Sequence, residues 1–426
     1  MAKGYEWTLN GPLPILEDHS RAKHDVLRAY VVNYLRILAL SPRSERVRVT
    51  LVDGFAGGGQ YQLPTGGIAP GSPLVLLEAL REARARVLID RQERGIRTPY
   101  IIEAQLHLVE NDQATWQCLK AVIEQTAEAN DAHTKVDVHY GTFDQHLPAI
   151  LSDIRARQKK GGRSVFVLDQ YGWSQVNMAS VKSIFSQLPS AEVFLTWMVD
   201  NLVNFLSNKT TEKLEPALRR VGLSEHLTAE KLLSIKNDAS EDSDLTWRRA
   251  IQSLMTEEIR ASADATYCTP FYIIPRDSRR GYWLLHLAQH LRANEEMKRI
   301  HWQNNNLHHP GGPGFNMLGF IGNNGQLAFD NRFDENAHRI TTQALHDDIP
   351  RRLSQMHTPV RFGELIRITA NETPARRQQM QEAVFALANE RHLIVRTESG
   401  AKRRTAQGLQ DDDAIELPTQ LWLLPH

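Results

Sequence analysis

Apolar runs of five or six residues recur along the first half of the chain, and segments with helical spacing of their apolar residues separate them. Such runs, bounded by glycine or acidic residues, are typical of strands buried in a parallel sheet. We expect strands at 47–52, 104–109, 135–140, 164–168 and 192–197. We expect helices before and between them at about 20–40, 74–95, 113–129 and 146–159. Strands that alternate with helices predict an open, Rossmann-like α/β sheet, which binds its ligand at the carboxyl ends of its strands.

The pattern changes after the fifth predicted strand. Residues 200–262 are polar with helical spacing, and they indicate a helical insertion over the sheet edge. Two further strands at 269–274 and 282–287 form a hairpin joined by a basic loop. A helix at 288–302 follows, and a segment rich in Asn, Gly, Pro and His comes after it.

The last part of the chain has the pattern of a small separate domain. Helical pieces at 341–355, 361–369 and 374–390 precede a strand at 392–396, a polar tip and a final apolar segment. Helix, turn, helix and a two-stranded wing are typical of a winged helix, which docks on DNA or on protein. We therefore expect an N-terminal arm (1–19), a Rossmann-like domain with its helical insertion (20–305), a linker (306–336) and a winged-helix domain (337–426).

Length and composition narrow the classes of function. A chain of 426 residues exceeds one ordinary core, and its 41% apolar and 23% charged residues are typical of a soluble globular protein. Fifty basic and fifty acidic residues cancel, so a contact with nucleic acid would need a local basic face. Two cysteines exclude a disulfide framework. The chain has no signal peptide and no apolar run long enough to span a bilayer, so we expect a cytoplasmic protein without membrane contact.

A glycine-rich loop directly follows the first predicted strand. Asp53 ends that strand, and Gly54-Phe55-Ala56-Gly57-Gly58-Gly59 continues from it. Glycine lets the backbone adopt positive φ and approach a bound molecule closely. A carboxylate at a strand tip accepts hydrogen bonds from a ligand amine or hydroxyl. We therefore assign Asp53, Phe55, Gly57 and Gly59 to a cofactor site.

Acidic or small residues also end the next two strands. Glu110 ends the second, where dinucleotide enzymes and class I methyltransferases both place the acid that accepts from the ribose hydroxyls. Thr142 and Phe143 follow the third, and we place Phe143 beside an adenine ring. The nicotinamide fingerprint needs a third glycine that opens a helix, which this loop lacks. The spacing is closer to that of methyltransferases, which bind S-adenosylmethionine.

The fourth strand ends in Asp169-Gln170-Tyr171-Gly172. Amino-methyltransferases carry an Asp/Asn-Pro-Pro-aromatic loop at this place. There a side-chain oxygen and a backbone carbonyl orient the target amine while the aromatic ring stacks on the base. Asp169 and Tyr171 are therefore candidate catalytic residues, and Gln170 is a candidate substrate contact. The alternative is an ordinary strand-end aspartate beside a packed tyrosine.

Taken together, these motifs resemble the three-Cys-motif partner family. The resemblance rests on Asp-Gly-Phe-Ala-Gly-x-Gly-x-Tyr at 53–61, Gly-Ser-Pro-Leu at 71–74, Glu110, Asp-x-Tyr-Gly at 169–172, and Met297-Lys298 with Trp302. It covers roughly 20–305 and implies a class I S-adenosylmethionine-dependent methyltransferase domain, distantly similar to a ribosomal-RNA adenine methyltransferase. It also implies a partner protein that bears three cysteines and resembles radical S-adenosylmethionine proteins. Gly58 and Gln170 stand where the family usually has proline.

Two functions stay open on these grounds. The first is a methyltransferase that acts on a base amine of nucleic acid, DNA or RNA. The second is a non-catalytic subunit that binds S-adenosylmethionine, nucleic acid or protein beside the three-cysteine partner, and Gln170 favours it. A nicotinamide enzyme is a third alternative, which the glycine spacing disfavours.

Basic residues supply the candidate contacts to a substrate. Lys23 lies on the first helix, and the resemblance suggests that this helix folds over the cofactor edge. For each of the remaining candidates the alternative is an ordinary solvated charge: Arg279, Arg280, Arg376, Lys402 and Arg403. We expect no metal, because the histidines at 301, 308 and 309 border or lie in a Gly/Pro-rich run without acidic ligands.

Overall fold

The five apolar runs predicted as strands all lie in one sheet, which forms the core of the first of two units. The computed structural model describes residues 5–158, 162–172, 174–198, 211–223, 227–238, 244–273, 282–303, 335–356, 359–401, 403 and 405–418. One unit holds Met1–Asp238 and Met255–Ala293, and the other holds Ala239–Leu254 and Asn294–His426.

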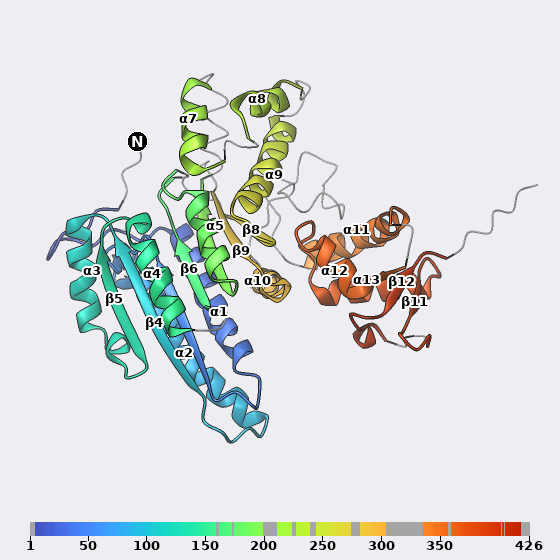
Figure 1. Cartoon of the computed structure of the whole chain (residues 1–426), viewed down its shortest axis with the longest axis horizontal. Coiled ribbons are helices and arrows are strands. Elements are labelled where there is room, and N and C mark those ends of the chain that lie inside the picture. Colours follow the sequence, from blue (N-terminus) through green and yellow to red (C-terminus); the bar gives the residue numbers. More distant parts are fainter. Residues whose placement is uncertain are drawn as a thin grey trace, which may run out of the picture. The chain divides into compact units, whose positions relative to one another are not determined.

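The large sheet has seven strands, five of them parallel (Figure 1). The parallel strands lie in the order β5 (Thr134–Tyr140), β4 (Ile101–Glu110), β1 (Arg46–Asp53), β6 (Ser164–Leu168) and β7 (Ala191–Trp197). The antiparallel hairpin completes the sheet, with β9 (Tyr282–Ala288) beside β7 and β8 (Tyr267–Ile273) at the edge. The prediction of a mostly parallel α/β sheet with a terminal hairpin is confirmed.

Helices cover both faces of this sheet, which explains why most residues of its central strands are buried. α1 (Asp18–Leu38) packs against α2 (Ser72–Glu93), and α4 (Phe143–Arg157) packs against α5 (Met178–Gln187) on the opposite face (Figure 1). α3 (Gln113–Gln125) connects β4 to β5 and is followed by a short 3-10 turn, η1 (Ala127–Asn130). Every residue of β6 and β7 is buried.

Two local features differ from the prediction. Residues after the glycine loop, expected to be irregular, form a small antiparallel hairpin of β2 (Gln60–Gln62) and β3 (Ile68–Pro70). Strands of three residues are too short to produce a periodic pattern. α4 begins at Phe143, three residues earlier than expected, because Thr142 and Gln145 form a capping box at its start.

The described residues of the predicted insertion are mainly helical. They contain α7 (Thr211–Val221), α8 (Ala229–Asp238) and α9 (Asp244–Ser262) (Figure 1), although α9 is divided between the two units at Leu254. None of the helices in the described parts of the chain is both long and apolar enough to cross a membrane.

The second unit combines helices with a small antiparallel sheet. Its helices are the first part of α9, up to Leu254, the end of α10 (Leu291–Gln303), α11 (Glu335–Ser354), α12 (Phe362–Thr369) and α13 (Arg377–Asn389). Its sheet has the order β10 (Val360–Arg361), β12 (Ala414–Glu416), β11 (Ile394–Arg396), with a 3-10 turn η2 (Ala406–Gly408) before β12. The partner of β11 is therefore β12, whereas the final apolar segment expected there lies outside the described residues.

The expected domain 20–305 includes all of α10, but from Asn294 onward this helix belongs to the second unit. The Lys298 ammonium donates to the carbonyl of Ala370 at 2.7 Å, and both groups are buried. The Trp302 indole N–H donates to the carbonyl of Pro374 at 2.9 Å. These contacts bind the end of α10 to the segment that follows α12.

Candidate functional site

The carboxyl ends of β1, β4 and β6 lie side by side at one edge of the large sheet. β1 pairs with β4 on one side and with β6 on the other, so that Asp53 is opposite Leu108 and Val167. The strand order reverses at this point, because the chain first adds strands outward from β1 to β5 and then returns to β6. A reversal of this kind opens a crevice that binds ligands in α/β sheets.

The glycine loop is held in place by hydrogen bonds to the end of β4. Gly57 has a φ of 63° and Gly59 has a φ of 85°, backbone conformations that residues other than glycine rarely adopt. The Gly57 N–H donates to Glu110 Oε2 at 2.9 Å, and the Ala56 N–H donates to the carbonyl of Val109 at 3.0 Å. These hydrogen bonds fix the conformation of the loop at the carboxyl edge of the sheet.

Asp53 presents a buried acceptor beneath this loop. Its Oδ1 accepts from the Phe55 N–H at 3.2 Å, whereas its Oδ2 is buried and has no hydrogen-bond partner among the described residues. Burial raises the pKa of Asp53 to about 7, although the nearby Ser72 side chain and the Phe55 N–H oppose the rise. A buried oxygen without a donor fits a bound molecule that supplies one.

Glu110 has a role in the loop as well as a position at the edge. Its Oε1 accepts from the Asp112 N–H at 2.8 Å, and its Oε2 accepts from Gly57. Burial raises the pKa of Glu110, and these backbone hydrogen bonds oppose the rise. Each carboxylate oxygen can accept a second hydrogen bond, so Glu110 can still accept from ligand hydroxyls.

Asp169 lies just after β6, and its carboxylate is paired with Lys23. The Lys23 ammonium donates to both oxygens, at 2.7 and 2.5 Å, and the Thr196 hydroxyl donates to Oδ1 at 2.6 Å. Burial by itself would raise the pKa of Asp169, but the Lys23 charge and these hydrogen bonds hold it below its usual value. Lys23, predicted to contact substrate, thus reaches the site from α1 as the partner of a predicted catalytic carboxylate.

The two residues after Asp169 differ sharply in exposure. Gln170 is buried, with its Nε2 donating to the carbonyl of Thr196 at 3.1 Å and its Oε1 accepting from the N–H groups of Gln175 and Val176. Its side chain holds the loop together, so it is not directed at a substrate. The Tyr171 side chain is 50% exposed and can contact a large ligand.

The N-terminal arm, expected to be irregular, covers the glycine loop. The Trp7 indole N–H donates to the carbonyl of Gln60 at 2.7 Å, and the ring packs against Gly57 and Gly58. A Cβ at position 58 would lie 2.3 Å from Trp7 Cδ1, so no side chain fits there. Tyr61 packs edge-on against Trp7, with 5.2 Å between the ring centroids.

The turn after β5 has a more structural role than expected. Thr142 is the N-cap of α4 and accepts from the Gln145 N–H. The Phe143 ring is buried in the core, in contact with Phe166 and so close to Gly54 that a Cβ there would lie 2.9 Å from it. The expectation that Phe143 lies beside a bound adenine stays a prediction, and the ring is 4% exposed.

The basic candidates in the second unit have partners within that unit. Arg376 is the N-cap residue of α13, and its guanidinium stacks on the Trp302 ring at 5.0 Å. Arg403 makes two hydrogen bonds to Asp413, at 2.7 and 2.9 Å. Arg279, Arg280 and Lys402 lie outside the described residues.

Sequence reasoning therefore found the edge of the site, but it missed Trp7 and Thr196. Trp7 is one aromatic residue in a segment without periodicity, and Thr196 lies within an apolar strand. Neither position carries a local signal, because each reaches the site only through the packing of distant segments.

Comparisons with known proteins add little to this description. Neither a protein-family model nor a curated protein matches the chain. Solved structures do match, among them one described as loganic acid methyltransferase with SAH, which is 7% identical. The match covers 66% of this chain and 99% of the other, with a TM-score of 0.22. A likeness of this degree says nothing about the chemistry of the site.

Proposed function

We propose that this protein binds S-adenosylmethionine at the carboxyl edge of β1 and β4 and methylates an exocyclic amine of a nucleic-acid base. The observation that carries the proposal is the buried Oδ2 of Asp53, for which the described part of the chain offers no hydrogen-bond donor, beneath a loop shaped by two glycines at positive φ. An amino-acid moiety supplies the donor that this oxygen lacks.

The residues present fit such a cofactor. Gly57 and Gly59 allow close approach to the loop, Asp53 would accept from the amino group, and Glu110 would accept from the ribose hydroxyls. When bound, the cofactor supplies an electrophilic methyl group on a sulfonium centre. Trp7, which packs on Gly57 and Gly58, would form a wall of this site or move aside for the ligand.

Asp169 and Tyr171 would receive the target base. A carboxylate that Lys23 and Thr196 keep ionised accepts from an amine N–H and orients the nitrogen lone pair towards the methyl group. Because the pKa of Asp169 is low, its contribution is to position the amine, and the proton that the nitrogen loses after methylation would pass to water at the exposed edge. The half-exposed Tyr171 ring would stack on the base.

The sheet also disfavours the nicotinamide alternative. In the dinucleotide-binding sheet a sixth parallel strand follows the fifth, with the order 3-2-1-4-5-6. Here the strand beside β7 is the antiparallel β9.

A non-catalytic subunit is the second candidate. It is favoured by Gln170, whose amide is occupied by backbone groups of its own loop and of β7, and by Asp169, which accepts three hydrogen bonds from the protein. Such a subunit would keep the cofactor site and use the second unit, as a winged helix, to bring a three-cysteine radical S-adenosylmethionine protein to nucleic acid.

Calorimetric titration with S-adenosylmethionine, followed by incubation with tritiated cofactor and mixed DNA and RNA, tests the proposal. We expect binding that Asp53→Asn weakens at least tenfold and that Asp25→Asn, which changes an exposed carboxylate on α1, leaves intact. We also expect transfer to a polymer, and we expect Asp169→Asn to abolish transfer while it preserves binding. Absence of binding would refute the cofactor assignment. Binding without transfer would favour the non-catalytic subunit.

A further inference from the structure

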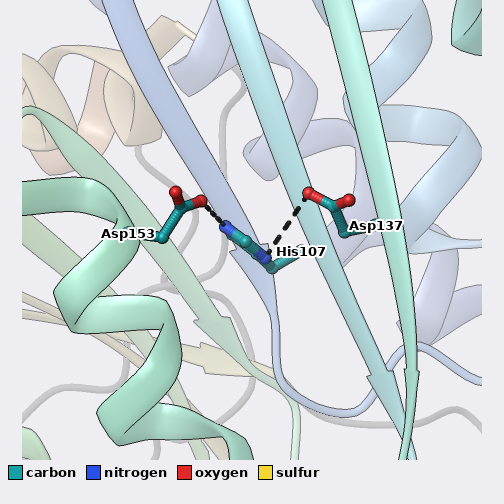
Figure 2. A group of neighbouring side chains, drawn as sticks. All are labelled: His107, Asp137 and Asp153. Atoms are coloured by element: carbon teal, nitrogen blue, oxygen red, sulfur yellow. Dashed lines mark ion pairs between the residues drawn. The ribbon is translucent and has the colours of Figure 1, made fainter. Parts of the chain in front are cut away.

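A second cluster of titratable side chains lies away from the glycine loop, between the sheet and α4. His107 is in the middle of β4, Asp137 is its register partner on β5, and Asp153 is on α4 (Figure 2). Both carboxylates point towards the imidazole ring, with His107 Nε2 3.2 Å from Asp153 Oδ2 and His107 Nδ1 4.0 Å from Asp137 Oδ2. One ligand atom from each of the three residues lies within 4.8 Å of the others.

The nitrogen that faces Asp153 lacks a hydrogen bond. The His107 side chain is 5% exposed, and its Nε2 is buried without a hydrogen-bond partner among the described residues, although the Asp153 oxygen is near. His107 Nδ1 lies 3.1 Å from Nε2 of His139, which is hydrogen-bond distance. If Nδ1 carries the proton, the Nε2 lone pair faces a carboxylate oxygen, and two acceptors at this distance repel unless a cation lies between them.

The two carboxylates are in turn held by outer hydrogen bonds. The Gln105 side-chain Nε2 donates to Asp137 Oδ2 at 2.7 Å and to Asp153 Oδ2 at 2.6 Å, and the Arg157 guanidinium donates to Gln105 Oε1. Outer partners of this kind orient the ligands of protein metal sites. Carboxylate oxygens have a second lone pair, so these hydrogen bonds leave each oxygen able to bind an ion.

We propose that His107, Asp137 and Asp153 bind one divalent transition-metal ion, with Zn²⁺ as the best fit. Ligands about 2.0–2.1 Å from a tetrahedral zinc ion lie about 3.3 Å from each other, which is close to the separation of His107 Nε2 from Asp153 Oδ2. Asp137 and Asp153 are partly exposed, so small side-chain rotations bring their oxygens into the coordination sphere and water completes it. A mixed nitrogen and oxygen donor set favours zinc and its neighbours over magnesium and calcium.

The position of the cluster gives such an ion a structural role. A bound ion would tie α4 to β4 and β5. The first turn of α4 contains Phe143, which packs under the glycine loop at Gly54.

The rival to this proposal is a network of ion pairs without metal. Lys135 lies 2.9 Å from Asp137 Oδ2, and with Gln105 it offsets part of the negative charge at the cluster. In that case the ion pairs of the cluster stabilise the sheet edge without a metal, and the cluster does not bind added metal specifically.

Titration of the untagged, chelator-treated protein with Zn²⁺ by calorimetry distinguishes the two. We expect one ion per chain, and affinity reduced at least tenfold in Asp153→Asn, a change that the partly exposed position tolerates. His133→Asn, an exposed histidine before β5, is the matched control and is expected to bind as the wild type does. The visible spectrum of the Co²⁺-substituted protein is expected to show the intense bands of a four-coordinate site, and Asp153→Asn is expected to reduce them.

The proposal would be overturned if Asp153→Asn bound Zn²⁺ with wild-type affinity. It would also be overturned if His133→Asn lowered the Zn²⁺ affinity as much as Asp153→Asn does. The absence of any Zn²⁺ binding would overturn it as well and would leave the ion-pair network as the explanation. These measurements use no S-adenosylmethionine, so their outcome is independent of the proposed methyltransferase.

Discussion

At the edge of the sheet, the contacts that a side chain makes in the folded protein determine its role, which the residue type alone does not. Asp169 was expected to contact substrate, and the structure adds Lys23 and Thr196 as its fixed partners. Lys23 was a candidate for a cofactor or phosphate contact, and its ammonium is instead bound to that carboxylate. Gln170, a candidate substrate contact, holds its own loop through three hydrogen bonds. The site therefore depends on pairs of residues from distant segments.

Replacing Lys23 by methionine is expected to destabilise the protein by about 1–3 kcal/mol at pH 7, because it leaves the Asp169 carboxylate without its counter-ion. Asp169 has a depressed pKa, so the stabilisation that Lys23 provides is present above the pKa of an unfolded aspartate, about 4, and is lost as the pH falls through the lower pKa of the folded state. Urea unfolding at pH 7 and at pH 3 measures both effects.

Lys120→Met is the control for the lost lysine, because Lys120 is exposed and lies 3.9 Å from Glu124 on one helix. We expect that change to cost less than about 0.5 kcal/mol. If Lys23→Met unfolds like the wild type at pH 7, or if its deficit persists unchanged in acid, the ion pair does not have the role assigned to it.

At the scale of elements, the glycine loop is supported from two sides. The end of β4 holds it from one side through Glu110 and Val109, and the arm covers it from the other through Trp7. The arm also pairs with β2, where the Leu16 N–H donates to the carbonyl of Gln62 at 2.8 Å. A segment that is irregular by composition is thus ordered by what it packs on.

A double-mutant cycle tests the contact between arm and loop. Gly58→Ala is expected to destabilise the protein by about 1–3 kcal/mol, because the new Cβ would lie 2.3 Å from Trp7 Cδ1. In a Trp7→Ala background the same change is expected to cost much less, since the obstructing ring is gone. Unfolding free energies of the four proteins give the interaction energy. Additive costs would mean that Trp7 does not determine which residue fits at position 58.

At the scale of the whole molecule, charge is balanced and the described basic candidates of the second unit are used within it. Basic and acidic residues number fifty each. Arg376 stacks on Trp302, and Arg403 pairs with Asp413. A protein of this kind has no long-range field that attracts nucleic acid, so affinity would depend on a few local contacts.

We therefore expect weak salt dependence of any nucleic-acid binding. Each neutralised phosphate contributes about 0.7–0.9 to the slope of log K against log salt, so three contacts from Arg279, Arg280 and Lys402 give a slope no steeper than about −3. Fluorescence anisotropy with labelled duplex and single-stranded oligonucleotides at several salt concentrations measures it. Serine at all three positions is expected to flatten the slope, while Arg396→Ser, at a surface ion pair with Glu416, serves as control. A steep slope that survives the triple change would place the interface elsewhere.

The sequence by itself determined most of the strands and helices and the positions of the acidic residues at the strand ends. The buried strands are mostly apolar, and Asp53, Glu110 and Asp169 end or directly follow β1, β4 and β6, so parallel pairing alone brings their ends to one edge. Three-residue strands and the early start of α4 were missed, because they depend on a few capping or pairing contacts that leave no periodicity.

Only the tertiary structure decided which of these residues meet. Lys23 and Asp169 are 146 positions apart, and Trp7 and Gln60 are 53 apart. His107, Asp137 and Asp153 form a cluster that no motif announces, since two strands and a helix each supply one member. The periodicity of apolar residues indicates which side of a helix or strand faces the core. A contact between distant segments arises from the packing of the whole sheet and its helices, and so it has no signature in the local sequence.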